Sequence, residues 1–375
     1  MLVNLVGSHR TRVLSVALIA VILACGCARS DPGSPEDVDG GKEAMAGRAT
    51  APVDDLSALR FKARQIFGVL PTEALSETHV VTEAKVRLGR MLYYEPRLSK
   101  NHDISCNSCH LLTEFGVDRQ PTSPGHRGQR GNRNSPTVYN AAFQVAQFWD
   151  GRAADVEEQA LGPILNPVEM AMASADDVVG VLRSIPGYEP IFRTAFPDAE
   201  NPITYDHIGI AIGAFERRLV TPSRFDDYLE SRSTLTDEEL RGLSTFIATG
   251  CPTCHMGPTF GGSIYQRLGL IHPYETQDLG RFELTQNPGD RHVFKVPTLR
   301  NVAETHPYFH DGSVAKLKEA IRLMAYHQLG KDLSVVDTEA IAAFLGSLTG
   351  RIDGAFIARP ELPPGGSETP APDPS

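Results

Sequence analysis

Residues 103–112, DISCNSCHLL, contain two cysteines and a histidine in the order Cys-x-x-Cys-His. The same order and spacing return far downstream in residues 249–257, TGCPTCHMG. Two thiols followed directly by an imidazole form a compact set of ligands or reactive groups. The chemistry of these two motifs therefore decides how the rest of the chain is interpreted.

Three kinds of site use paired cysteines. Two Cys-x-x-Cys pairs could supply four thiolates to a zinc ion, but that leaves the adjacent histidine unexplained twice. A redox disulfide of the thioredoxin type needs a βαβ setting, which the sequence does not indicate. Cys-x-x-Cys-His is the signature of c-type haem attachment, in which the thiols bond to the haem vinyl groups and the histidine ligates the iron. The sequence therefore predicts two covalent haems, attached through Cys106, Cys109, Cys251 and Cys254, with His110 and His255 as iron ligands.

The N-terminal residues indicate export. Arg10 and Arg12 precede an apolar run, residues 13–24, that is typical of a signal peptide and short for a transmembrane helix. The stretch ILACGCARS resembles a bacterial lipobox, so we interpret residues 1–27 as a lipoprotein-type export signal with Cys25 or Cys27 lipidated. A plain signal peptide is the alternative. The predicted location is the periplasm, with membrane contact only through a lipid anchor.

The remaining segments predict a mainly α fold. Residues 28–54 and 359–375 are rich in Pro, Gly and Asp and predict a flexible linker and a disordered tail. Thr236 with Glu239 forms a capping box before an apolar face, and Ser334 can cap a later helix. Each Cys-x-x-Cys-His motif falls in one half of the chain. We expect two cytochrome c-like domains, residues 55–219 and 220–358, each carrying one haem.

Composition narrows the partners. The 375 residues are 41% apolar, enough for two domains with their own cores, and carry a formal net charge of −10. An acidic chain of this kind argues against binding to nucleic acid. It suits a neutral substrate or a small cationic protein.

Several further stretches resemble the bacterial di-haem cytochrome c peroxidase family, which includes the MauG-type enzymes. They occur in the family's order over about residues 83–350 and are LGRMLYYEPRLS, ISCNSCH, GHRGQRGNRNSPTVYNAAF, AQFWDGRAADVEEQA, GPILNPVEM, VPTLRNV, PYFHDGSV and LKEAIRLM. Together they are much more specific than Cys-x-x-Cys-His alone.

The resemblance implies roles for individual residues. His110 would be the proximal ligand of the peroxidatic haem and His126 its displaceable distal ligand. His255 and Met324 would ligate the electron-transfer haem, although Tyr326, two residues further on, keeps open the tyrosine ligand of MauG-type enzymes. The resemblance also implies a relay tryptophan at Trp149, a catalytic glutamate at Glu169 with Gln159 as its companion, and a calcium ion held by Asn134, Thr305 and Pro307.

The implied activity is the reduction of hydrogen peroxide to water with electrons from a small c-type cytochrome or a cupredoxin. Family members commonly form homodimers, so a homodimer is expected here. Two other functions remain open: a MauG-like enzyme that oxidises a protein substrate, and a di-haem electron carrier without peroxidase activity.

Overall fold

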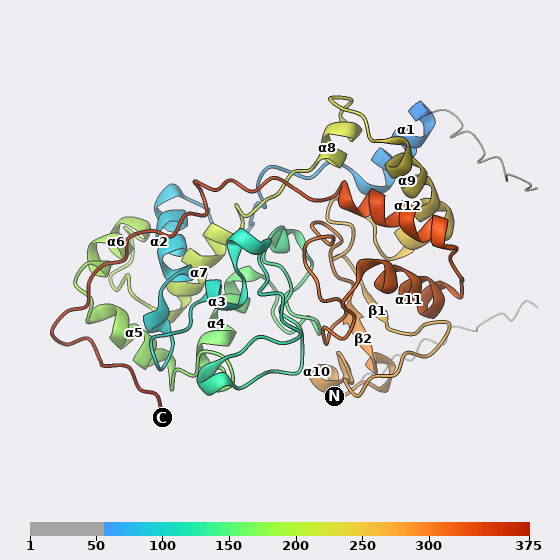
Figure 1. The fold of residues 1–375 in the computed structure, drawn as a ribbon. Coiled ribbons are helices and arrows are strands. Elements are labelled where there is room, and N and C mark those ends of the chain that lie inside the picture. The colour runs from blue at the N-terminus through green and yellow to red at the C-terminus, as the bar shows by residue number, and fades with distance from the viewer. Residues whose placement is uncertain (1–55) are drawn as a thin grey trace, which may run out of the picture. The chain divides into compact units, whose positions relative to one another are not determined.

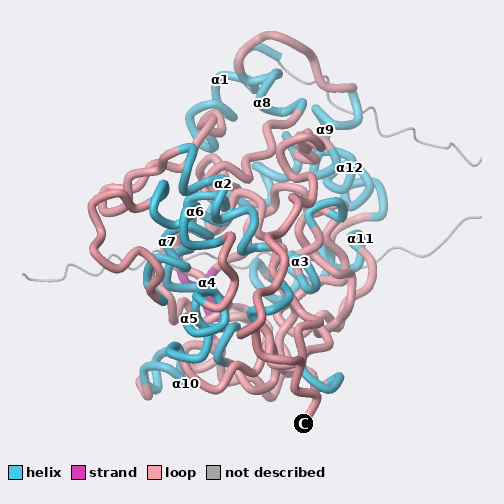
Figure 2. The backbone as a smooth tube through the Cα atoms, turned by 90° about the vertical axis from the view of Figure 1, so that its left-hand side faces the viewer, coloured by secondary structure: helices cyan, strands magenta, loops and turns pink. Residues whose placement is uncertain are grey.

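The computed structural model describes residues 56–375, in which helices joined by long loops make up almost all of the regular secondary structure (Figures 1 and 2). Its only sheet is an antiparallel pair, β1 (Tyr265–Arg267) and β2 (Val293–Lys295), with Gln266 opposite Phe294. The α-helices are α1 Leu56–Phe67, α2 Glu83–Tyr93, α3 Cys106–Cys109, α4 Val156–Leu165, α5 Ala175–Arg183, α6 Tyr188–Ala195, α7 Tyr205–Glu216, α8 Arg224–Leu229, α9 Asp237–Thr249, α10 Phe282–Thr285, α11 Leu317–Leu329 and α12 Val335–Gly346. Six single turns of 3-10 helix are η1 Pro96–Leu98, η2 Leu112–Glu114, η3 His126–Gly128, η4 Ala141–Phe143, η5 Cys251–Thr253 and η6 Pro288–Asp290. The prediction of a mainly α protein is confirmed.

A first hydrophobic cluster forms around α2, α4 and α7. The side chain of Thr82 caps α2 by accepting a hydrogen bond from the Lys85 amide at 3.3 Å. Gly89 allows α2 and α7 to cross closely, because a Cβ at this position would lie 1.8 Å from the Ala211 carbonyl oxygen. Fully buried members of the cluster are Leu88, Leu92, Tyr93, Ile164, Leu182, Phe192, Ile208 and Phe215. Each such side chain contributes roughly 1.5–3 kcal/mol by leaving water.

A second cluster forms between α9 and α12. The predicted capping box is present, since the Thr236 and Glu239 side chains each accept from the other residue's amide. Gly250 ends α9 with φ at +98°, a left-handed conformation that glycine adopts without steric cost. Ser334 caps α12 as predicted. The first thiol of the second Cys-x-x-Cys-His motif therefore directly follows a helix end that the sequence defines.

The two clusters do not divide the chain as two continuous segments. Phe67 on α1 lies in the second cluster, although the predicted first domain begins at residue 55. Phe356 and Ile357, assigned to the predicted second domain, pack in the first cluster. Apolar side chains at both ends of the folded range thus cross over to the other half, which a contiguous boundary near residue 220 does not describe.

The predicted tail also differs from its composition-based description. Residues 359–375 contain no helix or strand, but they make specific contacts with the first half of the protein. Arg97 Nη2 donates to the Pro363 carbonyl oxygen at 2.9 Å, and the Thr369 hydroxyl donates to the Ser184 carbonyl oxygen at 3.1 Å. Proline lacks an amide hydrogen, so an extended proline-rich chain can lie on a surface without leaving many donors unpaired.

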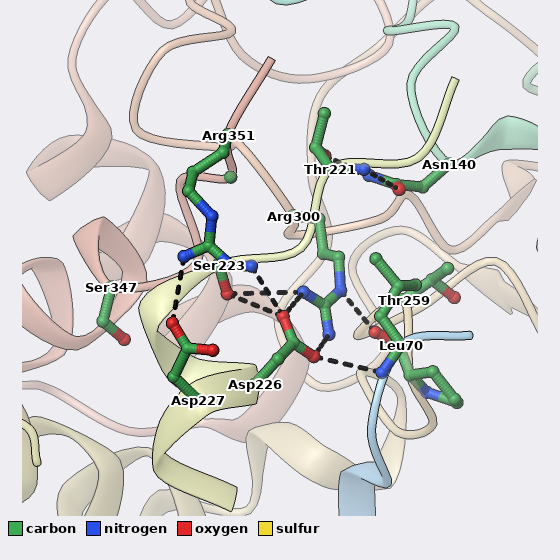
Figure 3. Close-up of polar contacts among 12 residues, drawn as sticks. Leu70, Asn140, Thr221, Ser223, Asp226, Asp227, Thr259, Arg300, Ser347 and Arg351 are labelled. Atoms are coloured by element: carbon green, nitrogen blue, oxygen red, sulfur yellow. Dashed lines mark hydrogen bonds and ion pairs between the residues drawn. The ribbon is translucent and has the colours of Figure 1, made fainter. Parts of the chain in front are cut away.

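A buried polar network lies where the chain passes from α7 to α8 (Figure 3). The Asn140 side chain donates to the Thr221 hydroxyl at 2.8 Å and accepts from the Thr221 amide at 3.0 Å. Asn301 also donates to the Thr221 hydroxyl, at 3.0 Å. Thr221 therefore links Asn140, which follows the first Cys-x-x-Cys-His motif in the chain, to Asn301, which follows the second.

Within residues 56–375, no helix is both long and apolar enough to cross a membrane. The predicted export signal, residues 1–27, and the predicted linker, residues 28–54, lie outside the described residues.

Candidate active site

The first motif is a single helical turn followed by a fixed histidine. Helix α3 begins at Cys106 and ends at Cys109, and His110 follows it immediately. His110 Nδ1 faces the Gly116 carbonyl oxygen at 3.4 Å, and the Tyr93 hydroxyl donates to the His110 carbonyl oxygen at 2.7 Å. A carbonyl oxygen can only accept, so Nδ1 carries the hydrogen and Nε2 keeps its lone pair.

The second motif has the same internal arrangement. Cys251 opens a 3-10 turn directly after Gly250, and His255 Nδ1 donates to the Phe260 carbonyl oxygen at 3.0 Å. Burial lowers the pKa of His110 and of His255, which keeps both imidazoles neutral. A metal-ligating histidine is typically held in this way, by a backbone carbonyl on its other nitrogen.

The thiols fit haem attachment better than zinc. All four cysteines of the described range are unpaired, and burial raises the pKa of Cys109 to about 11 and of Cys251 to about 12. Without a bound group they are therefore protonated thiols. Across residues 56–375, no three His, Cys, Asp or Glu side chains gather closely enough to hold a metal ion. The two cysteine pairs do not form a shared four-thiolate site.

A large cavity adjoins the second motif. His255 and Met324 both line it, as do the apolar side chains of Leu317 and Ile321. Trp149 lies on the same wall, where its Nε1 donates to the Asn134 carbonyl oxygen at 2.9 Å. An apolar cavity bordered by a histidine and a methionine sulfur fits a haem with these two side chains as axial ligands.

The residues named for calcium also lie at this cavity. Asn134, Thr305 and Pro307 all line it. Asn134 Nδ2 donates to the Gln120 carbonyl oxygen at 2.9 Å and to the Pro121 carbonyl oxygen at 3.3 Å, so its amide nitrogen faces away from any cation. The three residues thus border the same cavity.

His126 and Glu169 come together beside the first motif. The His126 amide donates to the Glu169 carbonyl oxygen at 2.7 Å. Gly125 makes this approach possible, because a Cβ there would lie 2.0 Å from the Val168 carbonyl oxygen. The imidazole of His126 is buried, with 5% exposure, and its Nε2 donates to the Ser375 carbonyl oxygen at 3.1 Å.

The Glu169 carboxyl group has the environment of a proton carrier. Burial raises its pKa, against smaller lowering effects from Arg152 and from the Asn166 amide, which donates to Glu169 Oε1 at 2.9 Å. Burial raises the pKa of the Cys109 thiol, with a smaller contribution in the same direction from the charge of Glu169. Gln159, on α4, is half-buried, and no hydrogen bond joins it to Glu169 among the described residues.

Comparison with known proteins decides the family. Residues 83–234 match the profile described as di-haem cytochrome c peroxidase. Cytochrome c551 peroxidase of Nitrosomonas europaea is 47% identical over 291 residues, covering 76% of this chain and 86% of the relative. Cytochrome c551 peroxidase of Pseudomonas aeruginosa is 43% identical, covering 86% and 94%. The chain belongs to the di-haem cytochrome c peroxidase family.

More distant similarities extend to the MauG branch. Methylamine utilization protein MauG of Methylorubrum extorquens is 33% identical, covering 85% of this chain and 92% of the relative. Among solved structures, a MauG-like protein associated with microbial copper homeostasis superimposes with a TM-score of 0.68 at 29% identity, covering 78% of this chain and 95% of that chain.

The choice between Met324 and Tyr326 separates the two branches within this di-haem family. Met324 lines the cavity together with His255. Tyr326 is 41% exposed, and its ring stacks on His272 with the ring centroids 4.3 Å apart. On α11 these two residues point in different directions, because positions two apart do not share a helix face.

Two buried polar residues of this di-haem peroxidase, Lys295 and His310, line the same cavity. Lys295 lines the cavity with 6% exposure, and its amine donates to the Gln144 side chain and to no carboxylate of the described range. His310 is 2% exposed, with Nε2 against the Thr276 hydroxyl at 2.9 Å and Nδ1 buried without a partner. A buried cation and an unpaired nitrogen facing one cavity fit an anionic group of its occupant, such as a haem carboxylate. Lys295 carries no local sequence signal, whereas His310 belongs to PYFHDGSV, one of the stretches on which the family resemblance rests.

Proposed function

We propose that this protein is a cytochrome c peroxidase that reduces hydrogen peroxide to water. The reaction is H2O2 + 2 H⁺ + 2 e⁻ → 2 H2O, and the electrons come from a small c-type cytochrome or a cupredoxin. Relatives at 41–47% identity are named cytochrome c peroxidases. The observation that carries the proposal is the pair of Cys-x-x-Cys-His motifs, each with Nδ1 of its histidine held by a backbone carbonyl.

The two motifs would each carry one haem in a cytochrome c-like domain. Two haems supply the iron on which peroxide is reduced and through which electrons pass. Cys106, Cys109, Cys251 and Cys254 provide the thioether bonds. His110 ligates the peroxidatic iron, and His255 with Met324 ligates the electron-transfer iron. A methionine ligand raises the reduction potential, which suits the haem that accepts electrons from the donor.

Glu169 would move the proton that peroxide cleavage requires. Breaking the O–O bond is easier when a proton passes from the inner to the outer oxygen, and a carboxyl group can accept and return it. The raised pKa of Glu169 brings its proton affinity closer to neutral pH, where such a group works best. Gln159 on the neighbouring helix is the proposed hydrogen-bonding companion of Glu169 once substrate is present.

Trp149 would lie on the electron route between the two haems. Its ring lines the cavity of the second motif, and its backbone carbonyl accepts from the Lys295 amide at 2.8 Å, which fixes it to β2. The donor is expected at the second haem. The net charge of −10 favours a cationic donor and speeds its approach at low salt.

His126 would be the removable ligand of the peroxidatic iron. In the oxidised resting state it blocks the position that peroxide needs. For peroxide to bind, residues 125–134 would have to rearrange and release it. This loop is rich in Gly and Arg, and Gly128 adopts φ of +72°, so it contains points where the backbone can turn.

Several finer properties complete the proposal. A calcium ion held by Asn134, Thr305 and Pro307 would tie the loops at the cavity, since oxygen ligands suit this hard cation. The protein would act as a homodimer in the periplasm, held to a membrane by lipid on Cys25 or Cys27.

A MauG-like reaction on a protein substrate would need Tyr326 at the second iron. The exposure of Tyr326 and its stacking on His272 speak against this ligand. A pure electron carrier would need two permanently six-coordinate irons, and a half-buried glutamate with a raised pKa next to His126 has no part in that function.

The decisive experiment is peroxide turnover by the purified di-haem protein before and after reduction by one electron. Turnover only after half-reduction supports both the peroxidase and the His126 gate. Turnover in both states keeps the peroxidase and removes the gate. Absence of turnover with both irons six-coordinate would favour the electron carrier.

The test of the proton carrier is Glu169→Gln, which preserves size and polarity. It should keep both haem spectra and lose at least about 100-fold in kcat, the low end of a general acid–base contribution. Near-normal turnover would exclude the proposed role.

A further inference from the structure

The chain after α12 returns to the first half and ends beside His126. In Figure 1 the red trace that leaves α12 passes α2, α6 and α5 before it reaches the end marked C. Residues 362–375, named here the C-terminal strap, are anchored along this path. Arg97 holds the Pro363 carbonyl oxygen at 2.9 Å, and Pro363 lies against Gly187, where a Cβ would come within 2.6 Å of its ring. Thr369 and Ser184 pair at 3.1 Å.

The last residues of the strap are clamped by one lysine. The Lys100 carbonyl oxygen accepts from the Asp373 amide at 3.0 Å. The Lys100 ammonium donates to the Ser375 carbonyl oxygen at 2.8 Å and lies 3.5 Å from the Asp373 carboxylate. Ser375 is further fixed because its amide donates to Asp373 Oδ1 at 2.9 Å. These contacts place one carbonyl oxygen at a defined position.

That backbone oxygen of Ser375 also accepts from His126 Nε2, at 3.1 Å. An imidazole nitrogen either carries a hydrogen or offers a lone pair. The Ser375 oxygen can only accept and so needs the hydrogen, whereas an iron ion needs the lone pair. The bond to Ser375 and ligation of iron through Nε2 therefore exclude each other.

We propose that the C-terminal strap binds the side chain of His126 and holds it in its off-iron position. This binding favours the open, peroxide-accepting state. The inference rests on the proposed function, in which His126 is a displaceable ligand. It adds a positioning residue, Lys100, which acts on His126 through the backbone oxygen of Ser375.

The same contacts couple the strap to the proposed proton carrier. The Lys100 amide donates to the Met170 carbonyl oxygen at 2.9 Å, next to Glu169, whose own carbonyl oxygen accepts from the His126 amide at 2.7 Å. Backbone hydrogen bonds thus join the clamp, the histidine and the loop that carries the carboxylate. Capture of His126 by the strap leaves Glu169 in place while the ligand position is free.

The test compares the intact holoprotein with two variants. One ends at Glu361 and lacks the strap, and the other is Lys100→Met, which removes the clamp from a full-length chain. Lys318→Met is the matched control, because Lys318 forms an exposed ion pair with Glu339 away from this site. Electron paramagnetic resonance and absorption spectra of the half-reduced protein give the ratio of five-coordinate to six-coordinate iron at the first haem.

Both strap variants should shift this ratio toward the six-coordinate form by about fivefold, the factor that one ordinary hydrogen bond contributes to an equilibrium. The control should match the intact protein. In a His126→Gly variant there is no imidazole that could return to the iron. Removing the strap from this variant should therefore leave the ratio of five-coordinate to six-coordinate iron unchanged. An unchanged ratio in both strap variants, or an equal shift in the His126→Gly background, would overturn the proposal.

Failure of the strap and failure of the proposed gate give different results. If His126→Gly leaves the six-coordinate spectrum of the oxidised protein intact, His126 is not the ligand and both ideas fail. If His126→Gly changes that spectrum while the strap variants do not, only the strap is excluded.

Discussion

Replacing Asp226 by alanine would leave the charge of Arg300 buried without a partner. The Arg300 side chain is 0% exposed and that of Asp226 is 2% exposed. The carboxylate accepts from Arg300 Nη1 at 2.7 Å and Nη2 at 2.8 Å, and from the amides of Ser223 at 2.8 Å and Leu70 at 3.0 Å (Figure 3). Burial alone would raise the pKa of Asp226, but the hydrogen bonds and charge of Arg300 leave it below its usual value. The pair is therefore ionised.

The expected loss follows from this geometry. Removing one partner of a buried, hydrogen-bonded ion pair costs about 3–5 kcal/mol in the free energy of unfolding, because the other charge stays buried without compensation. An entropy of unfolding of roughly 2.1 cal/mol/K per residue, taken over the described residues, converts this loss into a fall in Tm of about 4–7 °C. Thermal melts of the holoprotein followed by circular dichroism at pH 7 measure it.

Asp227 supplies the control on the same helix. It pairs with Arg232 at 2.7 Å and Arg351 at 2.9 Å, but these arginines are 53% and 58% exposed. Asp227→Ala should therefore cost less than about 1 kcal/mol. Equal Tm values for the Asp226 and Asp227 variants would refute the reasoning.

The Asp226 effect also has a predictable pH dependence. A carboxyl group whose pKa is depressed by folding stabilises the protein above its unfolded pKa, about 4, and loses that contribution as pH falls through its folded value. The difference in Tm between the intact protein and Asp226→Ala should shrink in acid.

Three further predictions concern the site and its surroundings. Met324→Leu should abolish the sulfur-to-iron charge-transfer band of the second haem, and a band that persists would assign the ligand to another residue. Lys295→Met removes a buried cation from the cavity, so potentiometry should find a lower reduction potential for the second haem, whereas Lys318→Met should leave it unchanged. Burial, aided by Glu157, raises the pKa of Glu216 to about 8, so its proton stabilises the fold fully below about pH 4.5 and less as pH rises toward 8. Glu216→Gln should remove this decline, which is on the order of a few kcal/mol in the free energy of unfolding and is followed as the pH dependence of Tm. An unaltered pH profile would show that Glu216 is already ionised.

The helices and haem motifs were predictable because their signals are local. A capping box needs residues three apart, and Thr236 with Glu239 form the predicted reciprocal hydrogen bonds. A Cys-x-x-Cys-His motif places its groups on one turn of chain, so spacing alone limits their geometry. The glycine after α9 was equally readable, because only glycine adopts φ of +98° without steric cost.

Other features depend on distant segments and have no local signal. Lys295 resembles any surface lysine in the sequence, and only the fold shows that it is buried beside a cavity. The predicted boundary near residue 220 assumes two continuous domains. Helix α1 nevertheless packs in the second hydrophobic cluster, and Ile357 packs in the first. The composition of residues 359–375 predicted disorder because it cannot report hydrogen bonds to Arg97 or Lys100 that form only after the first half has folded.

One loop connects the two halves of the proposed mechanism physically. Residues 125–134 begin next to His126, whose amide is bound to the Glu169 carbonyl oxygen, and end at Asn134. The Asn134 amide donates to the His310 carbonyl oxygen at 2.7 Å, and its carbonyl oxygen accepts from Trp149 Nε1 at 2.9 Å. The far end of the loop is therefore held by two residues that line the cavity of the second motif, while the near end carries His126, the proposed removable ligand. In the proposed mechanism a displacement at Asn134 would be taken up along the loop, because Asn134 is hydrogen-bonded on both sides. Gly128 and Gly131 have open space around them and leave room for that movement. Coupling between the haems then needs no movement of the helical cores, only a rearrangement of the segment that already bridges them.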